Sequence, residues 1–153
     1  RIKESYEVMR NYGFNVRGCV GSRGEVDERF IPTIRKYYDY GSTKNNHAGS
    51  YDGGFAIPYL TFANNPYRLW RYSMQLSTLE QMKNAVDTGI ENNGLVIFYG
   101  HAISTNDDNF TMSNFEALLS YIDTKVSALE CTVKTPYEAV KDYYTIRYDD
   151  IIN

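Results

Sequence analysis

The residue with the clearest chemical potential is His101, which follows the apolar run LVIFY at residues 95–99. A continuous apolar run of this length is typical of a strand that is buried on both faces in a parallel α/β sheet. Active sites of parallel α/β folds lie at the carboxyl ends of the strands, where a histidine can act as a general acid or base. A catalytic histidine is therefore one interpretation of this position. A surface or capping histidine at a strand end is the alternative.

Two polar loops carry further groups that could bind ligands. His47 lies in NNHAGSYDGG, and Asp107 and Asp108 lie in STNDDNF. His47 could contact substrate or metal, and the acidic pair could bind a cation, although solvated loop side chains explain both segments. The two histidines, at 47 and 101, lack the spacing of metal ligands. We therefore expect no catalytic metal to be held by this chain alone.

The composition limits the class of protein. The chain has 153 residues, of which 42% are hydrophobic and 23% charged, so it fits one folded domain and excludes wholesale disorder. A net charge of −3 provides no basic field for nucleic acid, and no apolar run is long enough for a membrane span. Fifteen tyrosines suit a sugar-binding surface, and a tyrosine-rich core or interface explains them equally. Cys19 and Cys131 are expected to be two buried free thiols rather than a disulfide.

Helix-like and strand-like patterns alternate along the chain. We expect helices over residues 2–12, with Gly13 as the stop, and 27–38, with regular structure beginning at Ile31 or Pro32. Three capping boxes, Ser77–Glu80, Ser113–Glu116 and Thr135–Glu138, predict three more helices. The expected strands cover residues 15–21, 38–43, 68–74, 95–99 and 130–134, and residues 44–66 read as a loop. About five mostly parallel strands with outer helices predict α/β architecture.

Four segments in order resemble the C-terminal half of polysaccharide deacetylases of carbohydrate esterase family four. The first segment resembles the helix that follows the family's metal-binding motif. The second segment resembles the family's third motif. The third resembles the arginine-bearing strand and the next helix, and the last the closing strand–histidine–helix segment. The segments are IKESYEVMRNYGF, NVRGCVGSRGEVDERFIPTIRKYYDYG, PYRLWRYSM with STLEQMKNAVDTGIENNG, and LVIFYGHAIS with MSNFEALLSYID and CTVKTPYEAV.

The resemblance implies hydrolysis of N-acetyl groups on a polysaccharide, assisted by a divalent metal such as zinc. It assigns His101 as the acid that protonates the departing amine, and Arg71 as the arginine that orients a catalytic carboxylate or the substrate. The backbone N–H that stabilises the oxyanion falls near Arg23. Trp70 and Tyr99 are the expected substrate-binding aromatics. The fold it implies is a partial (β/α) barrel over residues 1–144, followed by a C-terminal tail at 145–153.

The family's Asp-Asp motif and His-x-x-x-His motif are absent; the pair Asp149 and Asp150 lies in the tail. We therefore expect the metal ligands upstream of Arg1, in a longer protein of which this chain is the distal part. That missing segment, the tail or a second chain would cover the open side of the sheet. A polymeric substrate favours a location outside the cytoplasm or at the cell surface. The alternative is an inactive carbohydrate-binding or structural module, of a surface or phage type, that keeps the fold.

Overall fold

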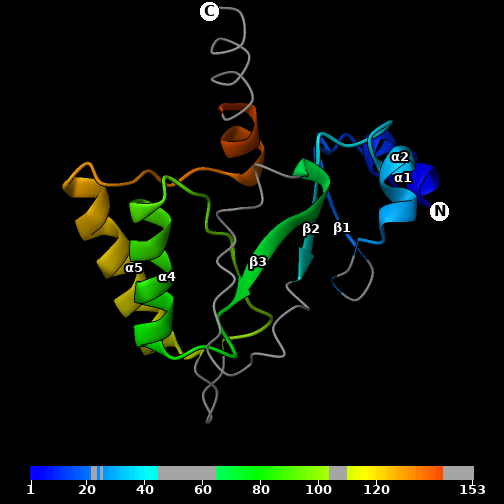
Figure 1. Ribbon diagram of the computed structural model, residues 1–153. Helices are drawn as coiled ribbons and strands as arrows, with labels where there is room; N and C mark the ends of the chain where they lie inside the picture. Colours follow the sequence, from blue (N-terminus) through cyan, green and yellow to red (C-terminus); the bar gives the residue numbers. More distant parts are fainter. Residues whose placement is uncertain (22–23, 25, 45–64, 104–109, 143–153) are drawn as a thin grey trace, which may run out of the picture. The chain divides into compact units, whose positions relative to one another are not determined.

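The computed structural model describes residues 1–21, 24, 26–44, 65–103 and 110–142. In these residues the chain is a mixed α/β protein whose strands pair in parallel (Figure 1). It divides into two compact units. The first unit comprises Arg1–Lys44, Thr61–Trp70 and Lys134–Asn153, and the second comprises Asn45–Leu60 and Arg71–Val133.

The first unit begins with helix α1 (Ile2–Asn11), which ends where Gly13 adopts a positive φ of 85°. Such a conformation costs glycine nothing and favours a helix stop. Strand β1 (Gly18–Val20) pairs in parallel with β2 (Tyr40–Lys44). Between these strands lie a 3₁₀ turn (Glu28–Phe30) and the short helix α2 (Ile31–Ile34). The helix begins at Ile31, as the proline at position 32 predicted, but it ends at Ile34 and does not extend to residue 38 as expected.

The second unit holds the other parallel pair. Strand β3 (Leu69–Ser73) follows the 3₁₀ turn η4 (Pro66–Arg68) and enters the second unit at Arg71. It pairs with β4 (Phe98–Tyr99) in a register that aligns Ser73 with Tyr99. Helix α4 (Leu79–Glu91) connects the two strands, and helix α5 (Met112–Ser127) packs beside α4 (Figure 1).

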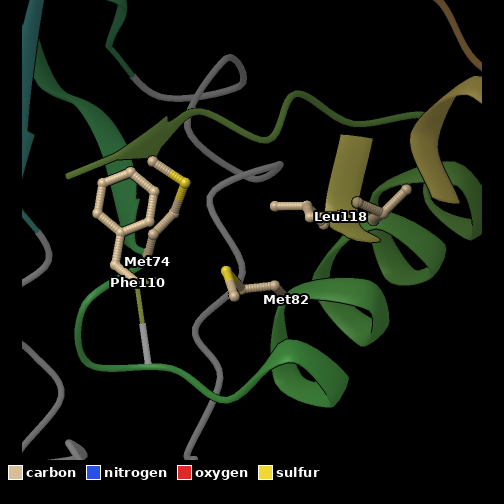
Figure 2. Packing of buried hydrophobic residues seen from close by; sticks show 5 residues of the cluster. Met74, Met82, Phe110 and Leu118 are labelled. Carbon is tan, nitrogen blue, oxygen red and sulfur yellow. The ribbon is translucent and has the colours of Figure 1, made fainter. Parts of the chain in front are cut away.

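The core of the second unit lies between the β3–β4 pair and helices α4 and α5. Figure 2 shows Met74, Met82, Phe110 and Leu118 in this core, and Val86 completes the buried cluster. Helical spacing places Met82 and Val86 on one stripe of α4, so both reach the same core. Burying side chains of this size contributes about 1.5–3 kcal/mol each to folding.

Two of the three expected capping boxes are displaced. Helix α4 is capped by Thr78, whose hydroxyl accepts a hydrogen bond from the Gln81 backbone N–H at 3.2 Å, while the Gln81 side-chain oxygen accepts one from the Thr78 backbone N–H at 2.8 Å. Ser77 is buried instead. Helix α5 is capped by Thr111 rather than Ser113. The third box is confirmed, since Thr135 and Glu138 exchange hydrogen bonds at the start of the helical residues 136–142.

The run LVIFY was expected to form a central strand buried on both faces, and this expectation was wrong. Only Phe98 and Tyr99 are in a strand, and residues 95–99 are half-buried. In the strand order β1-β2-β3-β4, β4 is a terminal strand of the part that the structure describes. It therefore has a described strand neighbour on one side, and helix packing covers one of its faces.

Two smaller expectations also fail. Residues 130–134 were expected to be a strand, but they have no regular structure, and Leu129 leaves helix α5 with a positive φ of 60°. The cysteines Cys19 and Cys131 are free, as expected, but each is half-buried rather than buried. Burial nevertheless raises the pKa of the Cys19 thiol to about 11, because it disfavours the thiolate. Among the described helices, none has the length and apolar character that crossing a bilayer requires.

Candidate functional site

The β3–β4 pair has one apolar face and one polar face. Successive residues of a strand point to opposite faces. Tyr72, Met74 and Phe98 point to the core beneath the helices, where the rings of Tyr72 and Phe98 meet edge to face. Arg71 and Tyr99 alternate with these residues, so they occupy the opposite face. The candidate site lies on this second face.

His101 lies just past the carboxyl end of β4. Its Nδ1 is 2.5 Å from Oε1 of Gln75, which lies just past the end of β3. The parallel register explains this contact, because counting on from the Ser73–Tyr99 pair brings positions 75 and 101 opposite each other. The ring of Tyr99 stands at 82° to the His101 ring, with centroids 6.3 Å apart. Both neighbours restrict how the exposed imidazole can turn.

Arg71 adds a cation to the same face. Its guanidinium carbon lies 4.7 Å from the centroid of the Tyr99 ring, a distance typical of a cation–π contact. Its Nε is buried and has no hydrogen-bond partner within the described residues. Burial lowers the pKa of Arg71, because the charged form loses hydration. A desolvated guanidinium with donors to spare favours a carboxylate or another anion as its ligand.

Gly100, between Tyr99 and His101, lies so close to the core that it leaves no room for a side chain. A Cβ at this position would lie 2.4 Å from an edge carbon of the Phe110 ring, far inside van der Waals contact. The Phe110 ring in turn packs perpendicular to Phe115, with centroids 5.7 Å apart. The missing side chain therefore lets Phe110 fill the core directly under the site.

Arg71, Gln75, Tyr99 and His101 together form what we call the His101 cluster. All four belong to the second unit. The arrangement offers an oriented imidazole for proton transfer, a cation for a carboxylate and an aromatic ring between them. Among the residues described, there is no group of three or more His, Cys, Asp or Glu side chains that could hold a metal ion. The described residues therefore do not fit the metal that the deacetylase resemblance implies.

The structure brings together three of the residues that the sequence indicated: Arg71, Tyr99 and His101. Trp70 is half-buried in β3, and as the neighbour of Arg71 it points to the other side of the strand. Several other candidates lie outside the described residues; these are Arg23, His47, Asp107, Asp108, Asp149 and Asp150.

Gln75 is the member of the cluster that the sequence analysis missed. It follows the strand segment RLWRYSM by one position, much as His101 follows LVIFY by two. A polar side chain just past the end of a neighbouring parallel strand is a signal that could have identified it. The pairing of β3 with β4 and its register were needed to use that signal.

Comparisons with protein-family models, with curated proteins and with solved structures gave no match to this chain. We therefore base the functional proposal on the geometry of the His101 cluster and on the order of the sequence motifs.

Proposed function

We propose that this chain supplies the proton-donating part of a polysaccharide deacetylase domain that removes acetyl groups from N-acetylated sugars. One observation carries the proposal. His101 stands at the carboxyl end of a parallel strand with its Nδ1 against Gln75, on the strand face that is turned away from the helix-packed core. In a (β/α) barrel this face points into the barrel, and the carboxyl end of the strand is the end where catalytic residues gather.

The chemistry follows from the leaving group. When water has added to the acetamide carbonyl, the C–N bond breaks and its electron pair goes to the sugar nitrogen, which is a poor leaving group unless it is protonated. A protonated His101 gives its Nε2 proton to that nitrogen, so a neutral amine departs and acetate remains. Arg71 binds a carboxylate on the same strand face as His101, and the face of the Tyr99 ring holds the guanidinium in place.

A metal that polarises the acetamide carbonyl is part of the reaction in the family that the sequence resembles. The described residues include no group of three or more possible metal ligands, so the roles proposed for these residues are proton transfer and anion binding. A partial barrel of the deacetylase type agrees with the parallel pairing of β1 with β2 and of β3 with β4.

The test is acetate release from N-acetylated oligosaccharides by the complete domain. We expect His101→Ala to lower the rate by about 10²- to 10⁴-fold, the usual contribution of a general acid. The far-ultraviolet circular dichroism should not change, because His101 is exposed. The control His47→Ala should change the rate little.

A rate for His101→Ala equal to that of the wild type would contradict the proposal. If the wild-type complete domain releases no acetate but binds the oligosaccharide in calorimetry, the protein is the carbohydrate-binding module that the sequence left as the alternative.

A further inference from the structure

We infer that Gln75 is a positioning residue for His101 and that it holds the ring proton of the neutral imidazole on Nδ1. The structural part of the inference stands on the contact between these two side chains. Its catalytic consequence rests on the proposed role of His101 as a general acid.

Geometry provides the first support. Oε1 of Gln75 is 2.5 Å from Nδ1 of His101, and an amide oxygen can only accept a hydrogen bond. The ring nitrogen that faces it must therefore be the donor. Gln75 itself is half-buried in the turn between β3 and α4, immediately after Met74, whose side chain is anchored in the core. The acceptor is therefore held by a fixed part of the unit.

The parallel register provides the second support. The backbone N–H of Met74 donates to the carbonyl of Tyr99 at 2.9 Å, so the ends of β3 and β4 are joined next to the two side chains. The Tyr99 ring stands beside the imidazole and limits its rotation. The contact between Gln75 and His101 thus follows from strand pairing and does not need a loop to bring the two residues together.

The tautomer matters for the proton that His101 transfers. Free neutral histidine favours the proton on Nε2, whereas an acceptor at Nδ1 reverses this preference. A protonated ring carries a proton on each nitrogen. When it gives the Nε2 proton to the departing amine, the neutral ring that remains has its proton on Nδ1. The amide oxygen of Gln75 accepts a hydrogen bond from this Nδ1–H group. Gln75 therefore stabilises the form of His101 that the transfer produces.

Two variants separate this role from a merely structural one. Gln75→Glu keeps an acceptor of the same length and has no amide nitrogen that could donate in its place. Gln75→Met keeps a similar length and shape but removes the acceptor. Leu76→Ala alters an exposed neighbour in the same turn and serves as the fold control.

The decisive measurement is the tautomer of His101 in nitrogen-15 spectra of this chain, recorded at a pH where the ring is neutral. Signals are assigned by comparison with His101→Ala. The wild type, Gln75→Glu and Leu76→Ala should show the proton on Nδ1, and Gln75→Met should shift towards Nε2. A wild-type ring with its proton on Nε2, or no shift in Gln75→Met, would overturn the inference.

This measurement does not depend on deacetylation, so it can fail or succeed separately from the proposed function. In the complete domain, Gln75→Met should lower kcat by about 10- to 100-fold with little change in KM. The substrate still binds when His101 is misplaced or carries its proton on the wrong nitrogen, but proton transfer is slower. Gln75→Glu should keep most of the wild-type kcat, because it keeps the acceptor. Equal rates in all three proteins would contradict the catalytic part of the inference.

Discussion

The two faces of the β3–β4 pair differ in what their side chains do. On one face Met74 packs with Met82 and Leu118, and these side chains are 8%, 1% and 2% exposed. On the other face His101 is exposed and Arg71 is half-buried, and the Arg71 guanidinium has a buried nitrogen without a hydrogen-bond partner in the described part of the chain. The side chains of the first face pack against each other within the unit, whereas the second face has a hydrogen-bond donor without a partner among the described residues.

This difference shows how folding and chemistry are divided between alternate residues of the same strands. Burial of apolar side chains on the core face stabilises the unit in proportion to the apolar surface that is removed from water. An unsatisfied buried donor on the other face works against stability. Such a group is expected where a ligand completes the hydrogen bonds, so the imbalance between the faces supports a binding role for the polar one.

The largest effect on stability is expected from Leu118→Ala, which removes a fully buried side chain of helix α5. The cavity should lower the free energy of unfolding by about 2–5 kcal/mol. The matched control is Leu119→Ala at the next position, where the side chain is 49% exposed and the loss should stay under about 1 kcal/mol. Urea unfolding followed by circular dichroism measures both. Equal losses would show that the core assigned to this face is wrong.

An intermediate effect is expected from Gly100→Ala, which links the two faces. The added Cβ would collide with the Phe110 ring, and the forced rearrangement should lower the free energy of unfolding by about 1–3 kcal/mol. The same shift should disturb His101, the next residue. In a double-mutant cycle, Phe110→Leu should recover part of the loss because it removes the ring. Strictly additive losses would contradict the collision.

The smallest effect on stability is expected from Arg71→Met. The change removes a cation–π contact worth about 0.5–1 kcal/mol and also removes the desolvation of a buried nitrogen, so the two should nearly cancel. The free energy of unfolding should stay within about 1 kcal/mol of the wild type, while acetate release by the complete domain falls. Arg35→Met, which removes an exposed cation from the Tyr67 ring, is the control and should leave acetate release unchanged. A loss of several kcal/mol in Arg71→Met would assign Arg71 to the fold instead of the site.

The helices of this chain could be predicted well where one face had to be buried. The stripe of Leu79, Met82, Val86 and Ile90 predicted helix α4, which buries Met82 and Val86. Helix α1 has no buried residue, and its end was predicted from Gly13 instead. The caps were harder, because Ser77 and Thr78 are adjacent and both can cap a helix. Ser77 is buried and Thr78 caps the helix, and burial depends on tertiary structure.

The candidate site could be predicted in part. His101 was indicated by its place after an apolar strand, Arg71 by the resemblance to polysaccharide deacetylases, and Tyr99 as an aromatic expected to bind substrate. Gln75 could not be found in the same way, because its role depends on which strand pairs with β4 and in which register. The apolar run LVIFY was misleading for a related reason. Its composition gives the hydrophobicity of the segment but not the number of strand neighbours that it acquires.

The register between β3 and β4 has a consequence for how the sequence can change. Ser73 lies opposite Tyr99, so Gln75 and His101 sit the same number of residues beyond that pair. Inserting or deleting a single residue between Ser73 and Gln75, or between Tyr99 and His101, would turn one of the two side chains towards the core and leave the other outside. Changes of length near these strand ends therefore have to come in pairs, whereas substitutions at the exposed Leu76 leave the spacing intact.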